Sequence, residues 1–439
     1  MLADLGYGSI DELFVDVPAG LKLSGRLDIE PAMSEPDLLA RLLDLGSKNR
    51  ARAGEVVSFA GAGAYDHEVP AVVRSLASRS EFVTAYTPYQ PEVAQGVLQA
   101  IFEYQTMVAR LAGLEVANGS LYDGAAALVE GVNLSVAATK CKRVLCSKGV
   151  PPSWRAVLKT FAAGTGHEVE LVEVTGGVTD WESSSAGGGR KAELGAVVVA
   201  APNYLGYLED VARAREVADR TGARLVVCAD PVAAGLLRTP GSLGADVVVG
   251  EGQVFGTSLG FGGPYLGLFA CRLADVRRLP GRLVGETVDS EGRRAYVTTL
   301  RAREQDIRRE KASSNVCTNQ TLMAVTAAIH LAWLGPRGLR EVAIRSGRAT
   351  RYLAEALFSI DGVEPCAKAP FLRELALRTP VESPVLIDRL LEEGYLAGVH
   401  VSEGFEGTPY DGALLMAATE RRTRAEIDGF AAALAKAVR

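Results

Sequence analysis

Two stretches near the middle of the chain decide its fold: Leu225-Val-Val-Cys-Ala-Asp-Pro231 and Asp246-Val-Val-Val-Gly-Glu-Gly-Gln253. Each contains a short, nearly continuous apolar run rich in valine. Runs of this kind are typical of strands that are covered by helices on both faces of a sheet. The first predicted strand leads to Asp230, and the second leads into a glycine-rich segment that continues to Pro264.

Similar runs on either side extend this pattern to the rest of the chain. They predict further strands at Arg143–Ser147, Glu168–Val174, Ala196–Ala200, Tyr265–Cys271 and Leu414–Ala418. Between and around them, helical spacing predicts helices at Glu92–Leu111, Pro152–Ala163, Leu208–Thr221, from Thr318 to Leu334, and from Arg424 onwards. Ser183-Ser-Ser-Ala-Gly-Gly-Gly, within Thr179–Lys191, predicts a surface loop. Strands that alternate with helices indicate an α/β fold with a mostly parallel sheet.

Composition excludes several classes of protein. The chain has 439 residues, 48% of them hydrophobic, which is enough for two domains with sizeable cores. Its net charge of −6 argues against a nucleic-acid-binding protein, which needs clustered basic surface. We expect no membrane span, because no run of apolar residues is long enough. The first residues show neither a basic leader nor an apolar signal core, so we expect a cytoplasmic protein.

Cysteine and histidine residues give no sign of a metal site. The six cysteines are scattered without a CxxC pair, and several lie in apolar runs, so buried free thiols are expected. The four histidines are also spread along the chain. We therefore expect no bound metal.

The two central strands and the glycine-rich turn resemble the core of an enzyme that uses pyridoxal phosphate (PLP). Such an enzyme joins the cofactor to a lysine amine as a Schiff base, shortly after a strand that carries an aspartate. Asp230 could pair with the pyridine nitrogen, although an aspartate before Pro231 could equally end a strand and begin a turn.

The lysine that this chemistry needs is missing. No lysine occurs from Ala192 to Glu310. Counting back from Pro264 puts the lysine position at Gln253, and counting forward from Asp246 puts it at Val254. A glutamine amide cannot form the imine, and Lys311 lies too far downstream to substitute. The sequence therefore predicts an enzyme scaffold that has lost its own cofactor chemistry.

A second feature argues against a bound phosphate. The small residues of Asn118-Gly-Ser-Leu-Tyr-Asp-Gly-Ala-Ala-Ala-Leu128 predict a turn that opens a helix, and the free N–H groups there could bind an anion. Asp123 falls at the expected N-cap, where its carboxylate would accept from those donors and repel phosphate. Because any helix can start with aspartate, this observation only supports the argument from Gln253.

Two further stretches are rich in polar and aromatic residues. The first comprises Phe59–Pro70 and Ala85–Glu92, and the second is Arg301–Asn319. The first suits a partner surface or the rim of a cleft, but it could also be a connection stiffened by prolines. The charged part of the second could be the solvated face of a helix. The small polar residues that follow, including Asn315, are harder to explain in that way.

These motifs together resemble the glycine cleavage system P-protein family (glycine decarboxylase), and specifically its subunit 1, or alpha subunit. The resemblance runs nearly from end to end. It rests on Gly8–Phe14, Gly61–His67, Tyr86–Pro91, Leu98–Ala100, Glu103–Met107, Val249–Gln253, Gly260–Gly267, Arg303–Gln305, Arg308–Ala312 and Ser314–Thr318. It implies a PLP-dependent transferase-like fold of type I, with an aminotransferase-like large domain and a smaller C-terminal α+β domain.

The resemblance also implies a division of labour. Bacterial P-proteins can be split into two homologous chains, of which subunit 2 carries the PLP lysine and subunit 1 does not. The assembled glycine dehydrogenase (aminomethyl-transferring, decarboxylating) releases CO2 from glycine and passes the aminomethyl group to the lipoyl arm of the H-protein. This chain would bind no cofactor, would be inactive alone, and would pair with subunit 2 in an α2β2 assembly.

The site residues implied by the resemblance follow from that division. We expect no catalytic residue in this chain alone, and vestigial cofactor positions at Asp123, Asp230 and Gln253. The candidates for the side that faces the partner's active site are Tyr65, His67, Tyr86, Tyr89 and Asn315. The predicted parts are an N-terminal arm and partner-contacting segment, 1–75, a large domain, 76–334, and a small domain, 335–439.

Two other functions are compatible with parts of the sequence. The chain could be a purely structural or regulatory homologue that holds the partner and adds nothing to its site. It could also be a free-standing PLP enzyme with an unanticipated lysine, against which Gln253 and Asp123 argue.

Overall fold

The computed structural model describes residues 1–439 except 50–55, 85, 187–192 and 261. It divides into two units, Met1–Glu55 and Val56–Arg439. The first unit contains one α-helix, α1 (Glu35–Ser47), after three short 3-10 helices at Ala3–Leu5, Ile10–Phe14 and Ala19–Leu21. Ser34 caps α1 by accepting from the N–H of Asp37 at 3.3 Å. No residue from Met1 to Asn49 is buried, so this arm has no core of its own.

The second unit is built on a seven-stranded sheet with the order β2-β10-β9-β8-β7-β3-β4. The strands from β4 to β9 in this order are parallel, while β10 is antiparallel to both of its neighbours. Their bounds are β2 Val116–Ala117, β3 Arg143–Ser147, β4 Glu168–Val172, β7 Ala196–Ala201, β8 Arg224–Ala229, β9 Val247–Glu251 and β10 Gly267–Cys271. All the strands predicted for this sheet are present, with ends shifted by one or two residues.

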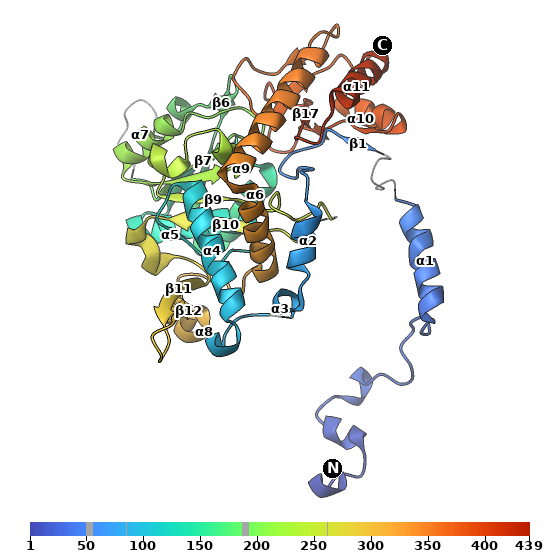
Figure 1. Ribbon diagram of the computed structural model, residues 1–439, viewed down its shortest axis with the longest axis vertical. Helices are drawn as coiled ribbons and strands as arrows, with labels where there is room; N and C mark the ends of the chain where they lie inside the picture. Colours follow the sequence, from blue (N-terminus) through green and yellow to red (C-terminus); the bar gives the residue numbers. More distant parts are fainter. Residues whose placement is uncertain (50–55, 85, 187–192, 261) are drawn as a thin grey trace. The chain divides into compact units, whose positions relative to one another are not determined.

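Helices cover both faces of this sheet because alternate strand residues point to opposite sides. In β8, Leu225 and Val227 pack with the helices of one face, whereas Val226 and Cys228 pack with those of the other. The first face is covered by α4 (Gln95–Ala112), α7 (Val211–Thr221) and α9 (Thr321–Leu357), and the second by α5 (Gly124–Thr139) and α6 (Pro152–Thr165). Figure 1 shows α4 and α9 lying side by side over the sheet.

A smaller antiparallel sheet has the order β13-β14-β17-β16. It consists of β13 Glu364–Pro365, β14 Glu374–Arg378, β17 Leu414–Ala417 and β16 Val399–His400. Its core includes apolar residues of α10 (Ser383–Glu392), α11 (Arg424–Ala437) and the second half of α9. α11 begins with a reciprocal capping box between Thr423 and Glu426.

The helix α9 is interrupted at Gly335, whose backbone has φ 58° and ψ −179°. Pro336 then starts the second segment, and its fixed φ suits a first helical turn. The break therefore falls where the sequence predicts that the helix after Thr318 ends. The division into 1–75, 76–334 and 335–439 remains a prediction.

The remaining elements are short and connect these two sheets to the rest of the unit. They are β1 (Val57–Ser58) paired with β15 (Tyr395–Leu396), β5 (Val174–Thr175) paired with β6 (Val178–Thr179), β11 (Leu283–Val288) paired with β12 (Arg294–Thr299), and the helices α2 (Ala71–Ala77), α3 (Ser80–Val83) and α8 (Gln305–Arg308).

Two segments and the exposure of the cysteines differ from the expectations. The charged stretch from Arg301 does not form one solvated helix, but three short turns at Arg301–Arg303, Gln305–Arg308 and Arg309–Lys311. Part of the predicted loop Thr179–Lys191 lies outside the described residues, and in its described part Trp181 is buried. The six cysteines are free, but only Cys146, Cys228 and Cys271 are buried, and Cys317 is exposed.

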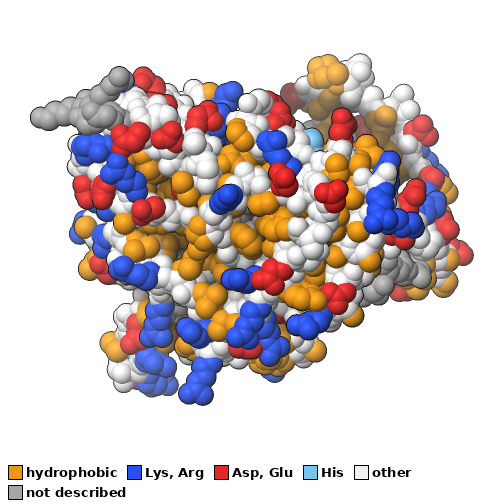
Figure 2. Space-filling view, turned by 90° about the horizontal axis from the view of Figure 1, so that it is seen from above, with side chains coloured by type: hydrophobic (Ala, Val, Ile, Leu, Met, Phe, Trp, Pro, Cys, Tyr) orange, Lys and Arg blue, Asp and Glu red, His pale blue; other side chains and the backbone are white. Residues whose placement is uncertain are grey.

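Figure 2 shows one face of the molecule, on which acidic and basic side chains are interspersed with apolar ones. Among the described residues, no helix is long and apolar enough to cross a membrane. The same part of the chain contains no group of three or more His, Cys, Asp or Glu side chains that could hold a metal ion.

A close backbone approach between the loop after β7 and the start of β14 gives a test of this fold. Gly206 has φ 88°, and a Cβ there would lie 2.2 Å from the carbonyl oxygen of Glu374. We expect Gly206→Ala to lower the free energy of unfolding by about 3 kcal/mol, because backbone must move to admit the methyl group. The matched control, Gly222→Ala, has φ 71° but open space, and should lose only about 1 kcal/mol from the left-handed backbone. Equal losses in urea unfolding would contradict the close approach.

Candidate functional site

The vestigial site lies at the carboxyl ends of β7, β8 and β9, where ligands bind in open α/β sheets. Asp230 follows the end of β8 and accepts from the N–H of Val232 at 3.0 Å. Its carboxylate also forms an ion pair with Arg373, with 2.7 Å between Oδ2 and Nη2. Asp230 therefore ends its strand in the way that the simpler interpretation expected, and its charge is already balanced.

Arg373 connects this strand end to two residues near the start of the second unit. Its Nη1 lies 2.6 Å from Nε2 of His67, and its guanidinium lies over the Tyr65 ring, 3.5 Å from the centroid. Because a guanidinium can only donate, Nε2 of His67 must accept. The hydrogen of the ring is then on Nδ1, which donates to Oε2 of Glu420 at 2.7 Å. An ion pair and hydrogen bonds thus connect these buried groups from Asp230 to Glu420.

Two carboxyl groups of this cluster have shifted pKa values. Burial raises the pKa of Glu374 to about 7, although hydrogen bonds from the Tyr65 hydroxyl and the Ala62 N–H, and the charge of Arg373, act in the opposite direction. Burial also acts to raise the pKa of Glu420, but the hydrogen bonds that it accepts from His67 and from the N–H of Glu68 outweigh this effect and lower the pKa to about 2.

The N-terminus of α5 is occupied by two carboxylates. Asp123 is its N-cap, as predicted, and accepts from the N–H of Ala126 at 2.6 Å. Glu251, at the end of β9, accepts from the N–H of Gly124 at 2.9 Å. The other Glu251 oxygen accepts from the N–H groups of Gln253 and Leu266. A phosphate at this helix end would meet the carboxyl groups of Asp123 and Glu251 instead of free donors.

Glu251 is a site residue that the sequence analysis missed. It lies within the quoted run Val249-Gly-Glu-Gly-Gln253, and the only local signal is an acidic residue at the end of an otherwise apolar strand. Burial raises its pKa to about 7, while its three N–H donors act to lower it.

Gln253 itself is buried, with 3% of its surface exposed. Its amide nitrogen donates to the carbonyl oxygen of Thr257, within the same loop. Its amide oxygen is buried without a hydrogen-bond partner among the described residues. The side chain is thus directed into its own loop.

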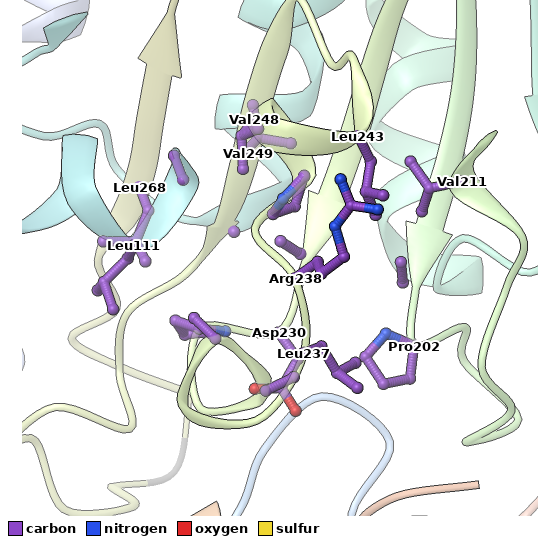
Figure 3. Close-up of a pocket in the computed structure, with 18 of the residues that line it drawn as sticks. Leu111, Pro202, Val211, Asp230, Leu237, Arg238, Leu243, Val248, Val249 and Leu268 are labelled. Carbon is purple, nitrogen blue, oxygen red and sulfur yellow. The ribbon is translucent and has the colours of Figure 1, made fainter. Parts of the chain in front are cut away.

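Two cavities meet at Asp230. The smaller, of about 80 Å³, is lined by Tyr65, Trp154, Asp230, Glu251 and Arg373, among other residues. The larger, of about 300 Å³, is mostly apolar; Figure 3 shows Asp230 beside Leu237 and Pro202 at one end of it. The volume of the smaller cavity is well below the roughly 300–1,000 Å³ of small-molecule and cofactor sites.

These residues do not fit PLP in this chain. The lysine position holds an amide, the anion site is filled by Asp123 and Glu251, and Asp230 is paired with Arg373. In addition, the Trp154 ring packs so closely on Gly124 that a Cβ there would lie 2.1 Å from it.

Of the other three candidate residues, Tyr89 contacts Arg282, and Tyr86 and Asn315 lie in the two segments that Arg282 joins. This buried guanidinium donates to Thr87, to the Tyr89 hydroxyl at 2.9 Å and to the carbonyl oxygen of Cys317 at 2.9 Å. It therefore ties the segment 86–91 to the segment 313–319. Tyr86 and Asn315, which lie in these segments, are exposed, and Tyr89 is 50% exposed.

The segment 313–319 is also attached to the beginning of α5. Asn319 donates to the carbonyl oxygen of Gly119, and Tyr122 accepts from the N–H of Cys317. The structure thus brings Tyr65 and His67 together in the buried charge cluster, and Tyr89 together with the segment that carries Asn315. Within the described residues, no hydrogen bond or ion pair joins the two groups.

Comparison with known proteins gives one consistent family. The family model described as glycine cleavage system P-protein matches residues 1–434. A probable glycine dehydrogenase (decarboxylating) subunit 1 from Chlorobium limicola is 46% identical over 436 residues, covering 99% of this chain and 97% of that protein. Another from Moorella thermoacetica is 45% identical over 434 residues, covering 99% and 96%.

Solved structures agree on the fold. The crystal structure of a glycine decarboxylase (P-protein) of the glycine cleavage system, in inhibitor-bound form, matches with a TM-score of 0.92 and 44% identity, covering 100% of this chain and 97% of that one. A sphingosine-1-phosphate lyase from Burkholderia pseudomallei matches with a TM-score of 0.67 at 16% identity, covering 96% and 94%. At that identity the second match shows the fold alone. The predicted PLP-dependent transferase fold of type I is confirmed.

The filled anion site leads to a prediction about Gln253. Restoring the lysine with Gln253→Lys should not confer PLP binding on the isolated chain, because Asp123 and Glu251 still occupy the helix N-terminus. The variant is mixed with PLP and dialysed, and the absorbance of the PLP that remains measures binding. As a matched comparison, Gln253→Lys combined with Asp123→Ser and Glu251→Gln removes both charges and should retain more PLP. Stable binding by the single variant would contradict the argument.

The raised pKa of Glu374 predicts a dependence of stability on pH. Its folded pKa of about 7 lies above the ordinary value of 4.5, so its contribution to stability is fully present below the ordinary value and is lost as the pH rises through about 7. Glu374→Gln keeps the shape without the titration. Between about pH 5 and about pH 8, the thermal midpoint of the wild type should fall relative to that of the variant. Parallel curves for the two proteins would contradict the shift.

Proposed function

Because this chain belongs to the glycine cleavage system P-protein family as a subunit 1, we propose that it completes an active site whose PLP is held by another chain. It is a subunit of glycine dehydrogenase (decarboxylating). The observation that carries the proposal is the filled vestigial site. Asp123, Glu251 and the Arg373–Asp230 pair satisfy, within this chain, the groups that would otherwise bind a cofactor.

The partner is the homologous, lysine-bearing subunit 2, in an α2β2 assembly. Two chains with the same fold can dock through the pseudo-symmetric surface that a homodimer would use. The assembled enzyme decarboxylates glycine, releases CO2 and transfers the aminomethyl group to the lipoyl arm of the H-protein. In that reaction bound PLP supplies the electron sink, and this chain excludes water and positions polar groups at the interface.

The surface that would face the partner's site is the group around Arg282. Tyr86, Tyr89 and Asn315 are exposed, while the buried Arg282 joins the segments that carry them. Tyr65 and His67 are instead engaged inside this chain, so their role in the proposal is to hold the cluster that shapes the interface.

The N-terminal arm supports an assembly role. Apolar side chains along Met1–Asn49 are exposed, among them Phe14 at 53%, Leu39 at 57% and Leu43 at 65%. Exposed apolar side chains on this scale are typical of a segment that contacts another protein. We therefore assign the arm to contact with subunit 2.

The direct test compares this chain alone with the same chain mixed with subunit 2. In the presence of H-protein, the exchange of the glycine carboxyl carbon with labelled bicarbonate should be absent for this chain alone and appear on mixing. Exchange by this chain alone would overturn the proposal and favour the free-standing PLP enzyme.

A second prediction separates a contribution to the site from a purely structural role. Asn315→Ala and Tyr86→Ala should lower the exchange rate of the assembled enzyme by about tenfold or more without weakening assembly, since they remove interface contacts to the reacting region. Sedimentation measures assembly in parallel. Arg309→Gln, an exposed change in the adjacent segment, serves as the control. Unchanged exchange in both variants would favour the structural homologue.

A further inference from the structure

A cationic cavity of about 260 Å³ lies beside the segment 300–313 and shares no lining residue with the two cavities at Asp230. Four of its lining side chains are basic, and none is acidic: the basic ones are Arg277, Arg303, Arg308 and Lys311. They come from four short helical turns, Leu273–Arg278, Arg301–Arg303, Gln305–Arg308 and Arg309–Lys311. In a chain with a net charge of −6, this concentration of positive charge needs a physical explanation.

Three neighbouring arginines outside the cavity have carboxylate partners, whereas Arg309 has none among the described residues. Arg278 lies 3.3 Å from Asp275, Arg301 lies 3.1 Å from Asp306, and Arg282 lies 3.9 Å from Glu304. None of the four cavity cations forms an ion pair within the described part of the chain. Like charges that share a cavity repel one another, and an anion between them would remove that cost.

Arg303 provides the second observation. Its Nη1 donates to the carbonyl oxygen of Leu279, but Nε and Nη2 are buried and have no acceptor among the described residues. Burial also lowers the pKa of this guanidinium. The charge of the neighbouring Glu304 acts in the opposite direction, but no ion pair joins it to Arg303 in the described part of the chain. Buried charged donors without acceptors are costly, so an added acceptor with negative charge would stabilise them.

The backbone around the cavity is held in uncommon conformations. Leu300 and Arg309, which flank the segment, both have φ 54°, in the left-handed region that residues with a Cβ seldom adopt. Strain of this kind is found where a binding site is preorganised.

We propose that this cavity binds a small oxyanion with two negative charges, either a phosphate group or a dicarboxylate. Guanidinium groups bind both through paired, charge-assisted hydrogen bonds. Nε and Nη2 of Arg303 have no acceptor among the described residues, and because both are buried, the side chain has to turn toward the cavity to donate from them. Lys311 and Arg308 supply charge at the exposed side, and Ser313 adds a hydroxyl. This site is additional to the proposed function and depends on none of its residues.

Titration calorimetry of the full chain, with inorganic phosphate and with malonate at constant ionic strength, tests the proposal. We expect the wild type to bind one equivalent of at least one of the two anions, and the tighter anion identifies the ligand class. Arg303→Gln and Arg308→Gln should weaken binding by about tenfold or more. Arg309→Gln removes the same charge from the next residue, which does not line the cavity, and should leave binding within about twofold.

Three outcomes would overturn the proposal. The first is the absence of binding to the wild type, and the second is equal weakening by Arg309→Gln and Arg308→Gln, which would show general screening. The third is loss of binding on mixing with subunit 2, together with weaker assembly of Arg308→Gln, which would show that the cavity receives carboxylates of the partner. Arg308 is exposed, so its variant decides the matter if Arg303→Gln does not fold. The exchange of the glycine carboxyl carbon with bicarbonate is measured on the same proteins. A failure of anion binding can then be distinguished from a failure of the proposed function.

Discussion

The buried ion pair between Asp230 and Arg373 is the interaction on which the rest of the site depends. A guanidinium with 5% of its side chain exposed requires partners for its charge and its donors. Asp230 supplies the charge from the large sheet, His67 supplies an acceptor, and Tyr65 supplies an aromatic face. Because Arg373 directly precedes β14, this one residue fixes the small sheet against the carboxyl edge of the large one.

The consequences extend to groups that do not touch Arg373. With Nε2 of His67 committed to accepting, Nδ1 has to donate, and Glu420 is drawn in as its acceptor. Glu420 in turn accepts from the N–H of Glu68, which fixes the chain beyond His67. Removing one member would leave a buried charge unpaired, whereas replacing both members of a pair by apolar groups can be nearly neutral. The pair is therefore better understood as a determinant of geometry than as a source of net stability.

The charged groups at the carboxyl edge of the large sheet are paired within this chain, whereas groups elsewhere are left without partners among the described residues. At the carboxyl edge of the sheet, Asp123 and Glu251 occupy the helix donors and Arg373 balances Asp230, so little is left there for an external ligand. By contrast, the arm exposes apolar side chains, Tyr86 and Asn315 are exposed around the Arg282 group, and the cationic cavity has no counter-charge among the described residues. This distribution is what a subunit of a larger enzyme requires, since its remaining binding capacity lies where other molecules can reach it.

The sequence by itself determined the features that are set locally along the chain. The apolar runs gave the strands of the large sheet, because burial on both faces leaves a direct trace in composition. Asp123 could be identified as the N-cap of α5, since a cap accepts from an N–H only three residues away. The absence of a usable lysine was also evident, because no folding can turn Gln253 into an amine.

Only the tertiary structure decided how distant residues meet. His67 and Glu420 are 353 positions apart, and Arg373 and His67 are 306 apart, so no local pattern announces their hydrogen bonds. The role of Glu251 depends on α5, which begins 127 positions earlier at Gly124. The separation of Tyr65 and His67 from Tyr89, and the gathering of four cations in one cavity, likewise follow from packing. Local propensity fixes elements, but the pairing of buried charges is settled only when those elements are brought together.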